Sequence, residues 1–415
     1  MEFLHATLEN GLEIVAECND EAHSTALGFF VETGARDETD DVAGVSHFLE
    51  HMMFKGTATR TAEDVNREFD EMGAHYNAFT SEESTVYYAS VLPEFQASSV
   101  ELLGDMLRPS LREEDFNTEK QVILEEIKMY EDQPPFGADD KCRAAYFAGH
   151  PLGKSVLGTS DSVGALPVEK MRDYFARRYS PGNIVLAAAG RIDFDALVRT
   201  AREVCGSWKP VAETRKIEPA QPRAGFKVLT KASAAQEYVL QMSSAPAAAD
   251  DDRYAAKLLT TMLGDDSGSR LYWELIDPGL AEHASLHHYE YLGAGAFLTY
   301  ISCEPAVTAE NMRRVLAVYR QAEADGFTPA ELSQAKSKIC SRVVLGSERP
   351  RGRLFVVGGN WTQRHEYRSV KDDLDTVEAI TLEEISAVLA RFPLTQPMSF
   401  AVGPLDSLPT PGSVV

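Results

Sequence analysis

The chain has 415 residues, of which 44% are hydrophobic, and its 64 acidic and 40 basic residues give a formal net charge of −24. This length suits two domains of about 200 residues, each with enough apolar residues for its own core. The negative charge argues against binding to nucleic acid or to anionic membranes, because both need a basic protein surface.

The cysteines and the N-terminus indicate the compartment. The five cysteines are widely spaced and include no Cys-x-x-Cys pair, a pattern typical of free thiols in a reducing environment. The N-terminus lacks the basic and apolar regions of a secretory signal. No apolar run is long enough to cross a bilayer. We therefore expect a cytoplasmic protein without a membrane anchor.

The chain is predicted to begin with strands. Residues 5–8 and 12–15 are predicted strands on either side of Asn10-Gly11, a dipeptide that favours a two-residue hairpin turn. Residues 25–31 are predicted to form a further strand. These features indicate that a β-sheet opens the first domain.

A helix with metal-binding potential is predicted next. Apolar residues recur at helical spacing from position 42 to 53, with Asp40 and Asp41 expected to cap the start and Gly56 to follow the end. His47 and His51 are four residues apart, so they lie on one helical face and can bind the same ion. Glu50 lies beside that ion and is free to exchange protons.

The order His-x-x-Glu-His is the inverted form of a zinc-peptidase signature. A pair of helix histidines that cap carbonyl groups or pack in the core would give the same run of residues. The interpretation therefore depends on a third ligand and a suitable scaffold.

Alternating elements follow the histidine helix: a helix (61–72), two strands (74–80 and 84–92) and two helices (100–107 and 113–131). Thr61 and Asp64 are expected to form a capping box at the first of these, and Gly73 to close it. Pro134 and Pro135 are expected to end the last helix.

The last of these helices supplies candidate third ligands. Glu119 and Glu126 fall on a stripe that is otherwise apolar, whereas Glu125 points away from it. Burying a carboxylate is costly unless it binds a cation or pairs with a charge. A catalytic zinc ion usually has three protein ligands and one open position. The alternative is an acidic surface helix, because the same segment also contains Glu113 and other acidic residues.

The second half of the chain repeats the order of the first. Residues 209–224 are polar and contain prolines, which predicts a linker between domains at 1–208 and 225–415. Strands at 226–229 and 236–242 then precede a helix at 250–263. Alignment of this helix with the histidine helix places Lys257, Thr260 and Thr261 opposite His47, Glu50 and His51.

We therefore predict an α+β fold made of two homologous sandwich domains. Each has a mixed, largely antiparallel sheet with helices packed on it, and the second is a degenerate repeat without metal ligands. A chance likeness between two halves that each place strands before a helix is the alternative.

These motifs together resemble the M16 (pitrilysin/insulinase) zinc metallopeptidases, and they are most similar to the branch that includes the mitochondrial processing peptidase. The resemblance lies in residues 44–57, 77–81 with 85–88, and 119–126. It extends into the second half through residues 264–271 and 279–281.

The resemblance implies a zinc-dependent endopeptidase that hydrolyses short or unfolded peptides in a chamber formed by two chains, either a homodimer or a heterodimer with a related M16 subunit. It also implies roles for individual residues. One zinc ion per chain would be bound by His47, His51 and Glu126, with Glu50 as general base, Glu119 as supporting carboxylate, and Asn77, Ala78, Phe79 and Thr80 as the edge strand that receives the substrate backbone.

The second half departs from the family pattern. Members usually carry an Arg and a Tyr, seven residues apart, that polarise the scissile carbonyl. Here Glu282 holds the Tyr position and the Arg position falls near Ile276. The candidates for a substitute are Tyr272, His288, Tyr289 and Tyr291. This departure leaves two alternatives open, namely a weakly catalytic or non-catalytic assembly subunit and a peptide-binding protein with structural zinc.

Overall fold

The computed structural model describes residues 1–132, 135 and 137–409, and it divides into two compact units. Unit 1 comprises Met1–Lys128, Lys154–Lys216 and Val344–Ser369, and unit 2 comprises Met129–Gly153, Ile217–Val343 and Val370–Val415. Each unit thus includes a segment from the other half of the sequence. The contiguous domains predicted at 1–208 and 225–415 did not include these two exchanges. Pro134, expected to end a helix, lies outside the described residues.

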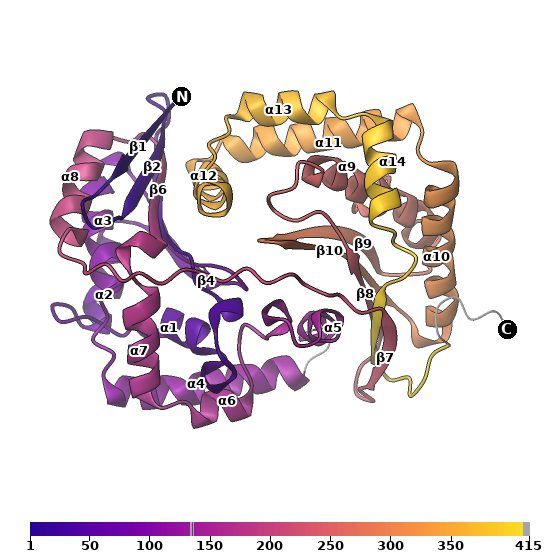
Figure 1. Cartoon of the computed structure of the whole chain (residues 1–415), viewed down its shortest axis with the longest axis horizontal. Helices are drawn as coiled ribbons and strands as arrows, with labels where there is room; N and C mark the ends of the chain where they lie inside the picture. Colours follow the sequence, from indigo (N-terminus) through magenta and orange to yellow (C-terminus); the bar gives the residue numbers. More distant parts are fainter. Residues whose placement is uncertain (133–134, 136, 410–415) are drawn as a thin grey trace. The chain divides into compact units, whose positions relative to one another are not determined.

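Unit 1 contains a six-stranded sheet with the order β1-β2-β6-β3-β5-β4. Figure 1 labels β1, β2, β4 and β6 of this sheet. The strands are β1 (Glu2–Thr7), β2 (Glu13–Cys18), β3 (Thr25–Val31), β4 (His75–Thr80), β5 (Thr85–Val91) and β6 (Ile184–Gly190). β2 and β6 pair in parallel, and the other neighbours are antiparallel. A hairpin turn forms at the predicted Asn10-Gly11, but the loop comprises the three residues 9–11 and not the two expected, because Leu8 pairs with Leu12. Gly11 has a φ of 91° that a residue with a side chain rarely adopts. β4 is an edge strand.

A layer of helices covers one face of this sheet. The helices are α1 (Val45–Met53), α2 (Ala62–Glu71), α3 (Gln96–Met106), α4 (Glu113–Asp132), α6 (Ser160–Ala165), α7 (Val168–Arg178) and α8 (Phe194–Cys205). Their apolar sides share one core with the sheet, in which Phe48 of α1 stacks on Phe116 of α4 at 4.6 Å between ring centroids. The predicted capping box of Thr61 and Asp64 is confirmed at α2. α1 and α4 are therefore held against each other by core packing.

Unit 2 contains a five-stranded sheet with the order β7-β11-β8-β10-β9. Its strands are β7 (Gly225–Thr230), β8 (Glu237–Ser244), β9 (His283–Tyr291), β10 (Ala294–Cys303) and β11 (Met398–Gly403). Its helices are α9 (Arg253–Gly264), α10 (Thr308–Asp325), α11 (Pro329–Ser347), α13 (Val370–Ala379) and α14 (Leu382–Arg391). The end of α11 extends into unit 1. β7 and β11 pair in parallel, as β2 and β6 do. The order therefore repeats that of β2-β6-β3-β5-β4, which confirms the predicted common plan.

Two exchanged helices cover the remaining faces of the sheets. α12 (Pro350–Arg364) packs on the sheet of unit 1, where its Leu354 and Val357 share a cluster with Phe30. A Cβ at Gly358 would lie only 2.4 Å from the Phe30 ring, so a glycine is needed there. α5 (Ala138–Phe147) likewise packs on the sheet of unit 2. The sequence pattern did not reveal the exchange because an apolar helix face does not specify which sheet it covers.

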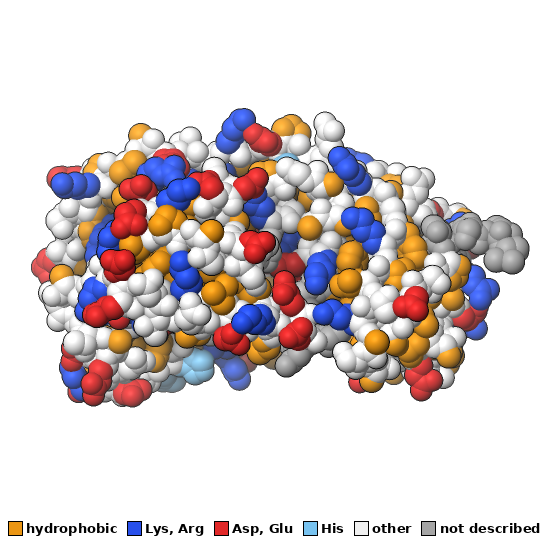
Figure 2. Space-filling model, turned by 90° about the horizontal axis from the view of Figure 1, so that it is seen from below, with side chains coloured by type: hydrophobic (Ala, Val, Ile, Leu, Met, Phe, Trp, Pro, Cys, Tyr) orange, Lys and Arg blue, Asp and Glu red, His pale blue; other side chains and the backbone are white. Residues whose placement is uncertain are grey.

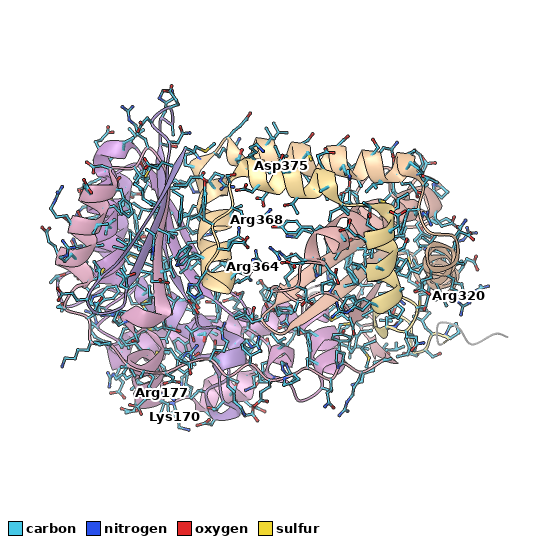
Figure 3. The ribbon with its side chains drawn as sticks, turned by 45° about the horizontal axis from the view of Figure 1, so that its top comes forward. Lys170, Arg177, Arg320, Arg364, Arg368 and Asp375 are labelled. Carbon is cyan, nitrogen blue, oxygen red and sulfur yellow. The ribbon has the colours of Figure 1, made fainter. Side chains whose placement is uncertain are left out.

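Unit 1 contains ion pairs both in its interior and at its surface. Arg353 of α12 donates to the buried Glu17 carboxylate through Nε at 2.8 Å, and also to the backbone carbonyl of Arg368, which Figure 3 labels near α12. At the surface, Lys170 of α7, which Figure 3 labels, forms an ion pair with Asp41. The face in Figure 2 shows acidic and basic side chains interspersed with apolar ones.

None of the described helices combines the length and apolarity needed to cross a membrane.

Candidate metal centre

The start of α1 is fixed by a carboxylate from an upstream loop. The backbone amides of Gly44 and Ser46 donate to the two Glu38 carboxylate oxygens at 2.7 and 2.8 Å. Gly44 has a φ of 92°, and a Cβ there would lie 2.7 Å from the carbonyl of Leu157. Burial raises the pKa of the Glu38 carboxyl to about 8. Glu38 thus satisfies amides that a helix N-terminus leaves unpaired.

The predicted cap by Asp40 and Asp41 is wrong. These residues are exposed and lie in a short 3-10 helix, Asp40–Val42. Gly44 separates this turn from α1, so the aspartates lie ahead of the turn at which the helix begins. Periodicity alone did not distinguish the 3-10 turn from the first turn of α1.

The three predicted metal ligands are brought together. His47 and His51 lie on one face of α1, with ring centroids 4.7 Å apart. Glu126 Oε2 of α4 is 3.8 Å from His47 Nε2 and 3.7 Å from His51 Nε2. Their candidate ligand atoms lie within 4.8 Å of one another, and no other such group of three occurs among the described residues.

The donors in this cluster fit a zinc ion. Two imidazole nitrogens and one carboxylate oxygen match the ligand types and the number at a catalytic zinc site. Burial lowers the pKa of His47 to about 3, with a smaller contribution from His51. The His47 imidazole is therefore neutral at pH 7, and its nitrogen lone pair is available to a metal ion.

Glu119 holds the second histidine. Its Oε1 accepts a hydrogen bond from His51 Nδ1 at 3.0 Å, and its Oε2 forms an ion pair with Lys55. A contact of this kind fixes the rotation and tautomer of the ring, so that His51 Nε2 faces Glu126. The sequence interpretation missed Lys55, although its position four residues after His51 places it on the same side of the chain at the end of α1.

Glu50 lies beside the ligands and contacts the substrate strand proposed from the sequence. The Thr80 hydroxyl of β4 donates to Glu50 Oε2 at 2.6 Å. Burial raises the pKa of Glu50, and the hydrogen bond from Thr80 opposes this shift. Thr80 was predicted to belong to the strand that receives the substrate backbone, and its side chain also contacts the predicted general base.

β4 leaves main-chain groups at an open edge. Ser81 donates to the Ser84 carbonyl at 2.8 Å across the turn, so hydrogen-bonded pairs alternate from that point and include Asn77 with Tyr88. The N–H and C=O groups of Ala78 consequently point away from β5. Asn77 Oδ1 accepts a bond from the Ala78 amide at 2.9 Å. The Phe79 side chain is 41% exposed on the face that α12 covers.

Comparison with known proteins agrees with this geometry. Residues 13–160 match the model of the insulinase family, peptidase family M16, and residues 165–339 match the peptidase M16 inactive domain. An uncharacterized zinc protease of Mycobacterium tuberculosis is 36% identical over 97% of this chain and 93% of its own length. The chain belongs to the M16 peptidase family.

Other relatives extend the M16 assignment. The uncharacterized zinc protease YmxG of Bacillus subtilis is 30% identical over 97% of this chain and 99% of its own length. A protease from Helicobacter pylori superposes with a TM-score of 0.91 at 21% identity, covering 97% of this chain and 99% of that protein. An M16 inactive-domain protein from Pseudomonas fluorescens reaches 0.91 at 17% identity, with 99% of each chain covered. These two structures show the shared M16 fold.

The matching region of unit 2 contains an ion pair. Lys257 of α9, which aligns with His47, contacts Glu290 of β9 with its ammonium group at 2.8 Å. The hydroxyls of Thr260 and Thr261 both donate to the Lys257 carbonyl at 2.9 Å. Among the described residues of unit 2, no cluster of three potential metal ligands is found.

The residues predicted as substitutes for the family's Arg/Tyr pair differ in exposure. His288 and Tyr291 are buried, and His288 Nε2 bonds to the Pro246 carbonyl at 2.8 Å. Tyr289 is exposed and Tyr272 is half-buried. Glu282, at the family's Tyr position, accepts a hydrogen bond from Gln236. Exposure therefore favours Tyr289 and Tyr272 over the buried pair.

Proposed function

We propose that this M16 family member is a zinc-dependent endopeptidase of the inverted His-x-x-Glu-His type. The observation that carries the proposal is the convergence of His47, His51 and Glu126, with Glu50 beside them and bonded to the edge strand β4. Its support from comparison is that two relatives over most of the chain are named zinc proteases. The structure supports a metal site at these residues, and the names of the relatives support zinc-dependent proteolysis.

One zinc ion per chain would be held by His47 Nε2, His51 Nε2 and a Glu126 oxygen. Zinc, when bound, supplies polarisation of the scissile carbonyl and lowers the pKa of a bound water to roughly 7. Glu119 keeps the His51 ring in its ligating orientation, and Lys55 keeps the Glu119 carboxylate in place. This support is the role usually taken by carboxylates behind ligating histidines.

Glu50 acts as the proton carrier. Thr80 occupies its Oε2, which leaves Oε1 to accept a proton from the attacking water. Glu50 then gives this proton to the nitrogen of the leaving amine. Because burial raises the pKa of Glu50, the carboxylate is a stronger base than an exposed glutamate.

The substrate is proposed to be a short or unfolded peptide that adds to β4. An extended backbone can bond to the free N–H and C=O groups of Ala78, after displacing the Asn77 side chain from the amide. Phe79 offers apolar surface to the substrate side chains that point toward the α12 face. A folded protein cannot present such a strand without local unfolding.

We further propose that the chain works as a dimer, with a second copy or a related M16 subunit. The family's Tyr position holds Glu282 and its Arg position falls near Ile276, so we propose that a carbonyl-polarising pair comes from other residues or from a partner. All five cysteines are free thiols, which supports the expected cytoplasmic location.

The test is hydrolysis of an unstructured fluorogenic peptide by the purified chain, with its size in solution measured in parallel. We expect activity that a chelator abolishes and that added zinc restores. Chelator-insensitive cleavage would contradict the metal mechanism. Peptide binding without cleavage would instead support a non-catalytic M16 subunit or a peptide-binding protein.

A further inference from the structure

The segment that leaves unit 1 carries an arginine, Arg215, whose side chain is only 10% exposed. We propose that Arg215 is a positioning residue that holds the β4–β5 turn, and through Thr80 the general base Glu50, in catalytic geometry. This inference rests on the proposed function. The sequence had suggested only a polar linker at 209–224.

Arg215 is bound on two sides. Its Nε and one terminal nitrogen donate to the two Asp37 carboxylate oxygens at 2.8 and 2.6 Å. The same terminal nitrogen donates to the backbone carbonyl of Glu83. The Arg215 and Asp37 side chains are only 10% and 4% exposed. A bidentate, buried guanidinium fixes both partners in direction as well as in distance.

The first branch from Arg215 leads to the β4–β5 turn. Glu83 belongs to this turn, and its carboxylate also pairs with Arg36. The Arg36 amide donates to the Glu82 carbonyl at 2.9 Å, so two arginines hold consecutive turn residues. The turn begins directly after Thr80, whose hydroxyl orients the proposed general base. A shift of the turn would therefore move the contact between Thr80 and the base.

The second branch leads to the start of α1. Asp37 also pairs with Arg178 at 3.0 Å, and Arg178 Nε donates to the Thr33 hydroxyl at 3.1 Å. The Tyr174 hydroxyl bonds to Thr33 at 2.7 Å and to Ser46 at 2.9 Å. Ser46 immediately precedes the first proposed ligand. The same arginine cluster thus supports both the ligand helix and the strand that faces it.

Stability alone does not account for this cluster. Replacing a buried ion pair by apolar residues is often neutral or stabilising, because desolvation offsets the attraction between the charges. The contacts of Arg215 instead join three separate stretches of chain: the 35–38 loop, the 81–84 turn and the exit segment. Fixing the relative positions of these stretches is what the guanidinium achieves and an apolar side chain would not.

The test is a double-mutant cycle between Arg215→Gln and Thr80→Val. We expect Arg215→Gln to lower kcat about tenfold, with a much smaller change in KM, because the base is misoriented by a small displacement. In the Thr80→Val background the same substitution should change kcat by less than about twofold, because the hydrogen bond between residue 80 and Glu50 is already absent. Additive losses would overturn the proposal.

Arg353→Gln is the matched control. It removes another buried bidentate arginine of unit 1, whose guanidinium donates to both carboxylate oxygens of Glu17 on β2. It should lower the melting temperature at least as much as Arg215→Gln but leave kcat unchanged. If Arg353→Gln lowers kcat as much as Arg215→Gln does, the effect of Arg215 is a general effect on stability and the positioning role is wrong.

Hydrogen exchange separates this proposal from the proposed function. In Arg215→Gln the amides of residues 35–38 and 81–84 should exchange faster, whether or not the chain cleaves peptides. Unchanged exchange there would overturn the positioning role even in an active enzyme. If Arg215→Gln does not fold, Arg215→Lys serves instead, because it keeps the charge but not the fork geometry, and we expect an intermediate loss of kcat.

Discussion

The two units place different side chains on the same scaffold. In unit 1, α1 and β4 bring together two imidazoles and a glutamate carboxylate that accepts a hydrogen bond from a threonine hydroxyl. In unit 2, α9 and β9 bring together the Lys257 ammonium and the Glu290 carboxylate, 2.8 Å apart. In unit 2 the positive charge beside the carboxylate is the Lys257 ammonium group, whereas the corresponding residues of unit 1 are potential ligands for a metal ion. Chemistry on this fold is therefore decided by a few side chains and not by the topology.

The difference between the two units predicts that the largest effect comes from replacing Glu50, the proposed general base of unit 1. Glu50→Gln should lower kcat about 10³-fold, because a general base typically contributes 10²- to 10⁴-fold. The zinc content should be unchanged, since Glu50 is not in the ligand group. Steady-state kinetics and metal analysis of the same preparation check both points. Glu125→Gln, at an exposed position of α4, is the control, and full activity of Glu50→Gln would refute the role.

Replacing Glu126, a proposed zinc ligand, should lower zinc affinity more than replacing Glu119, which supports His51. Glu126→Gln removes a ligand atom, and we expect purified protein with little bound zinc. Glu119→Gln removes only the support of His51 and should weaken zinc binding by about 10- to 100-fold. Competition with a chromogenic chelator measures both affinities. Equal losses would show that Glu119 is itself a ligand.

The metal-free protein should lose stability in acid through His47. Burial lowers the pKa of His47 to about 3 from its usual 6.5. The unfolded chain therefore binds the proton first, so this stability is present above pH 6.5 and is lost as the pH falls toward 3. Melting temperatures of the chelated protein at pH 7 and pH 5 measure the loss. His47→Gln should show a smaller difference, and an unchanged difference would assign it to other groups.

The smallest effect is expected in unit 2. Lys257→Ala removes the ammonium from Glu290, but the lysine is half exposed, so the loss should be about 1 kcal/mol or less. Peptidase activity should stay within about twofold of the original, because no proposed step uses this pair. Denaturant unfolding and the peptide assay check the two expectations. A large loss of activity would mean that the degenerate unit takes part in catalysis.

Local patterns were sufficient for much of the fold and of the metal site. The hairpin at Asn10-Gly11, the capping box at Thr61 and the ligand pair on α1 depend on residues within a few positions of each other. Such features follow from backbone geometry and periodicity. The placement of Glu126 beside these histidines required a resemblance to the family as well, because it depends on how α4 packs against α1.

The sequence by itself determined that His47, Glu50 and His51 lie on one turn of helix and that a strand-and-helix plan occurs twice. Only the tertiary structure decided that Glu38 caps α1, that Lys55 supports Glu119, that α5 and α12 change units, and that Arg215 is anchored in unit 1. The physical reason is separation along the chain. Helical spacing is fixed by covalent geometry, whereas a buried carboxylate or guanidinium finds its partner only when distant segments pack together.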